Sequence, residues 1–327
     1  MFSFITITGK KSVAGLLLLL IIAGTLLFAA CPDKKKEITG TSGNKSITAV
    51  NDSTVLINHL AFLTSATLAG RETATPGNLL AQQYIVRVMD SLKLLKTGES
   101  RLQPFPVGNE GKQGNNVIGY LKGTKYPDSY IVLTAHYDHL GTRNGQIYFG
   151  ADDNASGTAA LLTMAKYFAT HPPQHSILFV AFDAEEKGLV GSNYFTAHPT
   201  IPLSALLVNI NMDMIGRNDS NEIYICGTYH YPALKKFTDS IQPIPPIHVL
   251  LGHDNSAFGG LQDWTAQSDH YAFHKFKIPF LYFGVEDHPD YHRPSDTFDK
   301  IQKSFYYRVS NIILQTVLLL DRQQQLQ

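Results

Sequence analysis

Short, mostly apolar runs without polar alternation mark the strands expected in this chain. Runs of this kind are typical of strands that are buried on both faces of a sheet. Polar or charged residues follow each run, so we predict that each strand ends there and a loop begins. The runs are residues 116–121, 130–133, 176–182, 206–211 and 279–283, and residues 123–128 are expected to form a turn before the second of them.

Segments with apolar residues at helical spacing precede, separate and follow these strands. In residues 78–94, for example, Leu80, Tyr84, Val88 and Met89 fall on one face. Strands that alternate with helices predict an α/β fold with a mixed, mostly parallel central sheet covered by helices on both faces. The expected helices are residues 55–68, 78–94, 156–168, about 189–198, 231–241, 269–275 and 304–320.

Side chains that commonly bind metals follow several of the predicted strands. Ligands of parallel sheets bind at the carboxyl ends of the strands, so we expect these side chains to converge there. Imidazole and carboxylate groups are poor core material but good ligands for first-row metals. The residues are His136, Asp152 and Asp153 in a glycine-bounded loop, Glu185, Glu186, Asp213 and His292.

Two imidazoles and three carboxylates are more than one catalytic zinc takes, because such a zinc has three protein ligands and an open position. The set suits two metals if one carboxylate of the 152–153 pair bridges them, and a metal pair activates water and polarises a carbonyl. Glu185 would then be free to act as a general base. Asp138 would accept the other N–H of His136 and fix its tautomer. Each residue alone has an ordinary structural explanation, and only their joint occurrence points to a metal site.

The first 30 residues have the pattern of a secretory signal. Lys10 and Lys11 precede an apolar run that ends in small residues, and Cys31 follows directly;. We expect a lipoprotein-type signal at 1–30, a lipid anchor at Cys31, a flexible tether at 31–50 and a single catalytic domain at 51–327. An uncleaved anchor helix is the alternative. Both interpretations place the protein outside the cytoplasm, in the periplasm or at the outer membrane.

Charge and composition exclude other classes of function. The formal net charge is +0, with 27 Lys and Arg against 27 Asp and Glu, so no basic surface for nucleic acid is expected;. No glycine-rich phosphate loop precedes a helix, which disfavours a nucleotide enzyme. Of the 2 cysteines, Cys226 would have no disulfide partner if Cys31 carries lipid.

Five ordered motifs resemble one enzyme family. They are HYDHLG, GADDNASG, FDAEEKGLVGS, NINMDMIG and DYHRPSDT. They resemble the co-catalytic zinc metallopeptidases related to bacterial leucyl aminopeptidases and glutamate carboxypeptidase, family twenty-eight of the metallopeptidases. Further segments, such as LAGRETATPG and NNVIGYLKGT, extend the resemblance from about Leu60 to the C-terminus. The implied fold is that of zinc exopeptidases, phosphorylase/hydrolase-like.

The resemblance also implies residue roles and a cofactor of two zinc ions. Asp153, rather than Asp152, would bridge the metals, and a cis peptide bond is expected between Asp153 and Asn154. Tyr291 would assist the oxyanion. One metal would take His136 and Asp213 and the other Glu186 and His292, with Glu185 as general base and Asp138 behind His136. Manganese and cobalt also suit such a ligand set.

The implied reaction is hydrolysis of peptide bonds, with release of N-terminal residues as the expected specificity. A carboxypeptidase of the same family, a single-zinc glutaminyl cyclase and a relative that only binds peptides are the alternatives. Trp264 lies in a loop that is expected to line the substrate pocket. Asp269-His270 is a candidate for support of the site. The remaining histidines near the motifs are interpreted as structural or pocket-lining: His139, His253, His270, His274 and His288.

Overall fold

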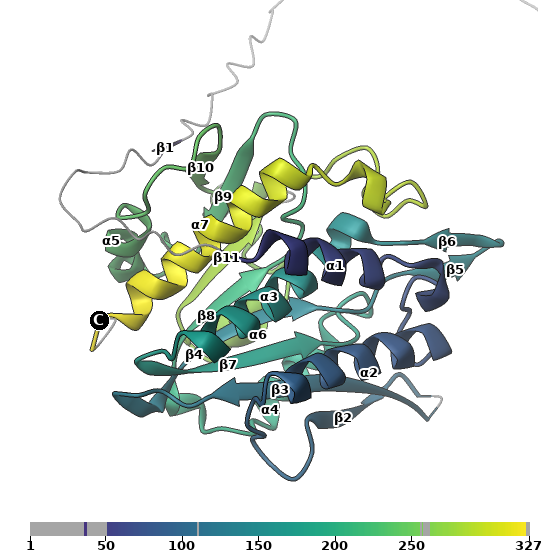
Figure 1. Cartoon of the computed structure of the whole chain (residues 1–327), viewed down its shortest axis with the longest axis horizontal. Coiled ribbons are helices and arrows are strands. Elements are labelled where there is room, and N and C mark those ends of the chain that lie inside the picture. The colour runs from purple at the N-terminus through teal and green to yellow at the C-terminus, as the bar shows by residue number, and fades with distance from the viewer. Residues whose placement is uncertain (1–35, 38–50, 110, 256, 258–261, 325–327) are drawn as a thin grey trace, which may run out of the picture. The chain divides into compact units, whose positions relative to one another are not determined.

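The structure is a computed structural model that describes residues 36–37, 51–109, 111–255, 257 and 262–324. The chain divides into Met1–Lys34 and a compact unit from Lys35 to Gln327. The expected signal segment and Cys31 lie outside the described residues, as does most of the expected tether. The second unit contains the central sheet and the helices that cover it (Figure 1).

A central sheet runs through the described part of this unit in the order β1-β10-β9-β11-β8-β4-β7-β3-β2. Its four middle strands β11, β8, β4 and β7 are parallel. Antiparallel pairs join β7 to β3, β3 to β2, and β11 to β9. The predicted α/β fold with a mixed sheet is confirmed. The strands are β1 (Lys36–Glu37), β2 (Leu102–Val107), β3 (Lys112–Leu121), β4 (Tyr126–His136), β7 (His175–Phe182), β8 (Leu206–Met212), β9 (Glu222–Cys226), β10 (His248–Leu251) and β11 (Phe280–Gly284).

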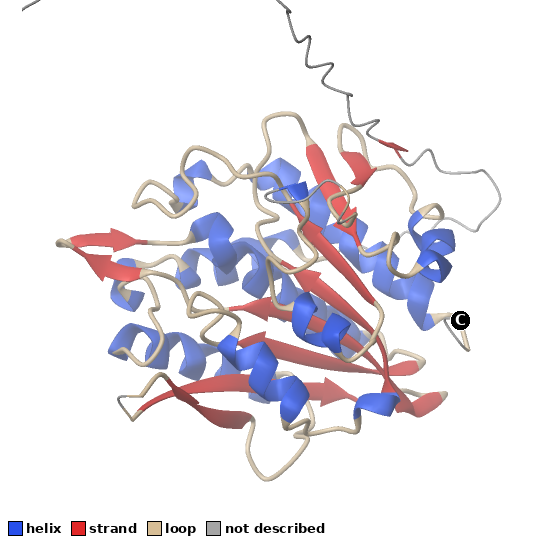
Figure 2. Cartoon of the chain, turned by 180° about the vertical axis from the view of Figure 1, so that it is seen from behind, coloured by secondary structure: helices blue, strands red, loops and turns tan. Residues whose placement is uncertain are grey.

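Helices cover both faces of the sheet, as the sequence predicts. Alternate residues of β4 face opposite sides: Ile131 and Leu133 join one core cluster, and Val132 joins the other. The first face packs against α1 (Ser53–Leu63), α2 (Pro76–Ser91), α3 (Gly157–Thr170) and α7 (Lys303–Asp321) (Figure 1). The second face packs against α4 (Val190–Ala197) and α6 (His270–Lys275) (Figure 2).

Several element boundaries differ from the prediction. The expected turn at 123–128 is wrong in its second half, because β4 already begins at Tyr126. The first expected helix, 55–68, ends at Leu63, and a separate turn η1 follows at Ala66–Leu68. The expected helix 231–241 is reduced to the turn η4 (Pro232–Leu234) and the short α5 (Lys235–Thr238).

Besides β1, which lies within the expected flexible tether, three strand regions were not predicted. The edge strand β2 contains Pro104 and Pro106, and both prolines are on its exposed side. An edge strand tolerates proline where the missing N–H would face away from the sheet. The other two regions are β10 and a separate hairpin of β5 (Gly141–Arg143) and β6 (Gln146–Tyr148).

Candidate active site

The carboxyl ends of the four parallel strands bring the candidate residues together. Each strand or its following loop supplies a different member of the set. His136 ends β4, Glu185 and Glu186 follow β7, Asp213 follows β8, His292 lies in the loop after β11, and Asp153 lies in the turn η2 (Ala151–Ser156) that leads into α3.

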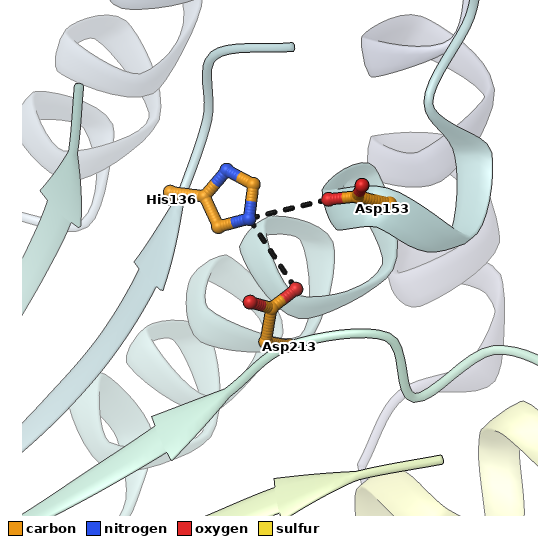
Figure 3. A group of neighbouring side chains, drawn as sticks. All are labelled: His136, Asp153 and Asp213. Atoms are coloured by element: carbon orange, nitrogen blue, oxygen red, sulfur yellow. Dashed lines mark hydrogen bonds and ion pairs between the residues drawn. The ribbon is translucent and has the colours of Figure 1, made fainter. Parts of the chain in front are cut away.

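The first cluster consists of His136, Asp153 and Asp213 (Figure 3). Nε2 of His136 lies 3.3 Å from Oδ1 of Asp153 and 3.3 Å from Oδ1 of Asp213. All three residues are buried. Their ligand atoms therefore face a common point.

The second cluster uses the other oxygen of Asp153. Nε2 of His292 lies 3.0 Å from Oδ2 of Asp153 and 3.4 Å from Oε2 of Glu186. Nδ1 of His139 lies 2.7 Å from Oε1 of Glu186. Asp153 thus directs one oxygen to each cluster, which is the geometry of a bridging carboxylate. His139 was interpreted as structural or pocket-lining, yet its imidazole is part of this cluster.

The histidines and carboxylates shift one another's pKa values. Burial disfavours the charged form of His292, but Asp153 and Glu186 outweigh it and raise its pKa to about 10. Burial likewise opposes ionisation of Asp153, but His139, His136 and His292 hold its pKa well below the usual value. Burial raises the pKa of Glu185 well above its usual value.

Asp138 supports the site in two ways. Nδ1 of His136 donates to the backbone carbonyl of Asp138 at 3.2 Å, and the Asp138 carboxylate is slightly farther from Nδ1, at 3.6 Å. The carboxylate also accepts the backbone N–H groups of Glu185 (3.1 Å) and Glu186 (3.3 Å). Asp138 therefore fixes the position of the glutamate pair as well as that of His136.

A buried polar chain supports Asp213. Ser268 donates to Oδ2 of Asp213 at 2.7 Å, and Asn211 donates to Ser268 at 2.9 Å. Thr134 on the neighbouring strand donates to Asn211 at 2.6 Å. A feature of the sequence indicates these polar contacts: Asn209, Asn211 and Asp213 alternate with apolar residues, and so share one face of the strand and its end;.

A second polar network holds the loop that carries His292. Asp296 is buried and accepts the backbone N–H groups of Asp152 (3.0 Å) and Asp153 (3.2 Å). Nε2 of His288 lies 3.1 Å from Oδ2 of Asp152. Asp152 thus points away from the two clusters, which agrees with the choice of Asp153 as the bridging residue.

The site opens into a small pocket of about 80 Å³. Tyr291 lies beside it with its ring stacked on His292 at 3.9 Å between centroids. Trp264 contributes to the wall, as predicted from the sequence. The lining residues are Asp153, Glu185, Glu186, Asp213, Met214, Trp264, Gln267, Tyr282, Val285, Asp287, Tyr291 and His292. The expected cis peptide bond between Asp153 and Asn154 is also present.

A metal pair fits these residues. In the described part of the chain, no Lys or Arg forms an ion pair with Asp153, Glu186 or Asp213, so the ion pairs of these buried carboxylates are with imidazoles. Oε1 of Glu186 and both ring nitrogens of His139 are buried and have no hydrogen-bond partner among the residues that the structure describes. Imidazole and carboxylate donors in this number suit zinc.

Comparison with known proteins identifies the family. The model of peptidase family M28 matches residues 116–317. The chain belongs to peptidase family M28. The family resemblance predicted from the five motifs is confirmed.

Similar proteins include aminopeptidase YwaD of Bacillus subtilis (strain 168), which is 29% identical over 250 residues. That match covers 71% of this chain and 50% of YwaD, so the chain spans about half the length of this relative. Among solved structures, the aminopeptidase from Aneurinibacillus sp. strain AM-1 has a TM-score of 0.67 at 18% identity, and the match covers 85% of this chain and 96% of that one. Glutaminyl cyclase of Porphyromonas gingivalis has a TM-score of 0.64 at 17% identity over 82% of this chain and 98% of that one. These two structures share the fold.

Proposed function

We propose that the protein is a zinc-dependent aminopeptidase that releases N-terminal residues from peptides outside the cytoplasm. The main support is the pair of imidazole–carboxylate clusters that share Asp153. Membership of peptidase family M28 and the similarity to aminopeptidase YwaD support the same reaction.

Five residues would hold two zinc ions. Asp153 would bridge, His136 and Asp213 would complete one position, and Glu186 and His292 would complete the other. When bound, the metal pair would lower the pKa of a water molecule and polarise the scissile carbonyl group. The protein side chains would supply the proton transfers and the orientation of the substrate.

Glu185 is the proposed general base. It lines the pocket beside both clusters and belongs to neither, so its carboxylate is free to accept a proton. It would take a proton from the attacking water as the new C–O bond forms. It would then give that proton to the peptide nitrogen as the C–N bond breaks, so that the amine leaves neutral.

Tyr291 is the proposed hydrogen-bond donor to the oxyanion. Burial and the neighbouring carboxylates raise its pKa, so the hydroxyl stays protonated at neutral pH. Its ring is held against His292 at the pocket. A donor that is fixed in place before the reaction stabilises charge that develops in the transition state.

The charges of the pocket favour a free N-terminus over a free C-terminus. Carboxylates line it, including Glu185 and Asp287, and none of its described lining residues is Lys or Arg. The nearby cations are engaged elsewhere: Lys187 pairs with Glu72 at 2.7 Å, and Arg217 with Asp290 at 2.5 Å. Bound zinc would neutralise the carboxylates that hold it, but Asp287 is not a proposed ligand, and its charge would still attract the substrate's ammonium group and repel its carboxylate;.

The single-zinc cyclase is the weaker alternative. Both clusters retain a complete set of ligands, whereas a cyclase of the expected type needs one metal. Similarity to the glutaminyl cyclase structure shows a shared fold and carries no activity by itself.

The test is a panel of peptides with free and blocked ends, assayed with zinc and then with a chelator. We expect removal of N-terminal residues from peptides with a free amine, no reaction with N-acetylated peptides, and loss of activity on chelation that zinc restores. Cleavage that requires a free C-terminus would contradict the proposed direction. Conversion of N-terminal glutamine to pyroglutamate without hydrolysis would support the cyclase instead.

The proposed location outside the cytoplasm rests on the N-terminal sequence, with lipid attached at Cys31. In the described residues, no helix is both long and apolar enough to cross a membrane. Growth with a labelled fatty acid should label the wild-type protein in the membrane fraction, and Cys31→Ala should abolish the label. A label that survives this substitution would contradict the anchor.

A further inference from the structure

The imidazole of His139 is fixed by the backbone around it. Its backbone N–H donates to the carbonyl of Arg71 at 3.3 Å. Its ring lies against Gly150, where a Cβ would approach two ring carbons to 2.5 Å. Only glycine leaves room for the ring at this point, so the direction of the imidazole is set by packing and not by a flexible side chain.

This ring directs Nδ1 at the second cluster. Nδ1 lies 2.7 Å from Oε1 of Glu186 and 3.7 Å from Oδ2 of Asp153. The side chain is fully buried. Among the described residues, neither ring nitrogen of His139 nor Oε1 of Glu186 has a hydrogen-bond partner. The short contact therefore does not follow the direction of a ring N–H, and both atoms keep a lone pair free for a third group.

The spacing of these two imidazoles and two carboxylates suits one shared cation. Donors at ~2.0–2.2 Å from a tetrahedral zinc are ~3.3 Å apart. Around the second cluster the corresponding separations are 2.7 and 3.7 Å for His139, and 3.0 and 3.4 Å for His292. Each of the two nitrogens thus lies at ligand spacing from both carboxylates, and the two imidazoles contact different oxygens of Glu186.

We propose that His139 is a fourth protein ligand of the metal position formed by Asp153, Glu186 and His292. The inference rests on the proposed function, because it concerns the same metal pair. With His139 as a ligand, the two metal positions differ in their number of protein ligands. The His139 position has four protein ligands, as structural zinc sites do, whereas the position of His136, Asp153 and Asp213 has three and keeps room for water or substrate.

Zinc titration of the full chain and its variants tests this assignment. Wild type should bind two zinc ions per chain. His139→Ala should weaken one of them by more than the ~10–100-fold that loss of a hydrogen-bond partner of a ligand costs. His139→Asn keeps an N–H donor for Glu186 but is a poor zinc ligand, so it should weaken the same ion as much as Ala does. His59→Gln is the matched control, because it removes a buried histidine outside the site and should leave both affinities unchanged.

Two titration results would overturn the assignment. If His139→Asn restored wild-type affinity, His139 would be only a hydrogen-bond partner of Glu186. If both variants bound two zinc ions with unchanged affinity while wild type cleaved peptides, the proposed function would stand and the ligand assignment would be wrong. A wild-type protein that bound no zinc would instead overturn the proposed function, and the ligand assignment with it.

A spectroscopic measurement on the wild-type protein does not depend on how the variants fold. With ¹⁵N-labelled histidine and ¹¹³Cd in place of zinc, couplings between cadmium and ring nitrogen identify each bound imidazole. We expect three coupled imidazoles, from His136, His139 and His292, with His139 bound through Nδ1. Two coupled imidazoles, from His136 and His292 alone, would overturn the inference.

Discussion

Glu185 and Glu186 are adjacent in the sequence but have opposite surroundings. Glu186 contacts the imidazoles of His139 and His292, which hold its pKa below the usual value against the effects of burial and of Asp153. Glu185 belongs to neither cluster, and burial raises its pKa. One step along the chain thus separates the proposed metal ligand from the proposed proton acceptor.

This difference predicts opposite results for two matched substitutions. Glu185→Gln should lower kcat by ~10²–10⁴-fold, because the amide cannot accept the proton, and it should leave the zinc content unchanged. Glu186→Gln should lose zinc, because it removes a charged ligand. Peptide kinetics and metal analysis of both purified variants check this. A fully active Glu185→Gln enzyme would contradict the assignment of Glu185 as the general base.

The residues proposed as ligands could be singled out from the sequence because each one interrupts a local pattern. His136 and Asp213 follow the apolar residues of buried strands, where a charged group costs free energy unless a partner compensates it. His139 carried no such signal, because the residues after a strand are commonly polar. Its role depends on the ring packing against Gly150, a contact that the sequence does not show.

The loop after β11 is the element that delivers Tyr291 and His292, and side chains rather than regular structure hold it. Asp296 at its end binds the backbone of Asp152 and Asp153 on the opposite side of the site. Asp290 within it pairs with Arg217. The loop and the turn η2 are therefore fixed against each other by buried polar contacts.

Removal of the Asp296 carboxylate should loosen both segments. Asp296→Ala leaves the buried N–H groups of Asp152 and Asp153 without an acceptor, at a cost of ~1–3 kcal/mol for each unsatisfied group. We expect a lower free energy of unfolding and weaker zinc binding, measured by urea denaturation and zinc titration. Asp296→Asn retains one acceptor oxygen and should recover part of both losses. Unchanged zinc affinity in Asp296→Ala would contradict the coupling.

At the level of elements, the sequence predicted the strands and helices of the core better than those at the edges. Buried strands such as β7 have uniform apolar runs because both of their faces are covered;. The strand β2 alternates buried residues with exposed prolines, and β10 is only four residues long, from His248 to Leu251. Their pairing with neighbours, rather than their own composition, determines that they are strands.

For the molecule as a whole, the site is a concentration of buried charge that a metal pair would neutralise. Zinc that binds only the folded state stabilises it by ~2.7 kcal/mol at a free concentration 100-fold above Kd. For a domain of this size, that corresponds to a Tm lower by ~5–10 °C after chelation. Thermal melting at several zinc concentrations checks this. A Tm independent of zinc would contradict metal binding at these residues.

Stability should also depend on pH through His59, which is far from the site in sequence. Its Nδ1 lies 2.7 Å from the hydroxyl of Tyr84, which links α1 to α2. Burial, with a smaller effect from Lys166, lowers its pKa to about 4. Because the unfolded chain binds this proton near pH 6.5, the contribution of neutral His59 is complete above ~6.5 and is lost as the pH falls toward 4.

The measurement compares zinc-free wild type with His59→Gln. Between pH 7 and pH 4.5 the free energy of unfolding should fall by ~2–3 kcal/mol more in wild type than in the variant. His198→Gln, at an exposed position, is the control for removal of a histidine. Parallel pH profiles for wild type and His59→Gln would contradict the shifted pKa.

The order of the proposed ligands along the chain also determines when each becomes available during translation. His136, Asp153 and Asp213 have all been made once residue 213 has been added, but His292 comes much later, and α7 must still follow to cover the sheet. The nascent chain therefore contains the residues of the first cluster long before those of the second are complete. With the ligands proposed above, the growing chain has no complete metal pair, and so no peptidase activity of the proposed kind, until His292 has been added.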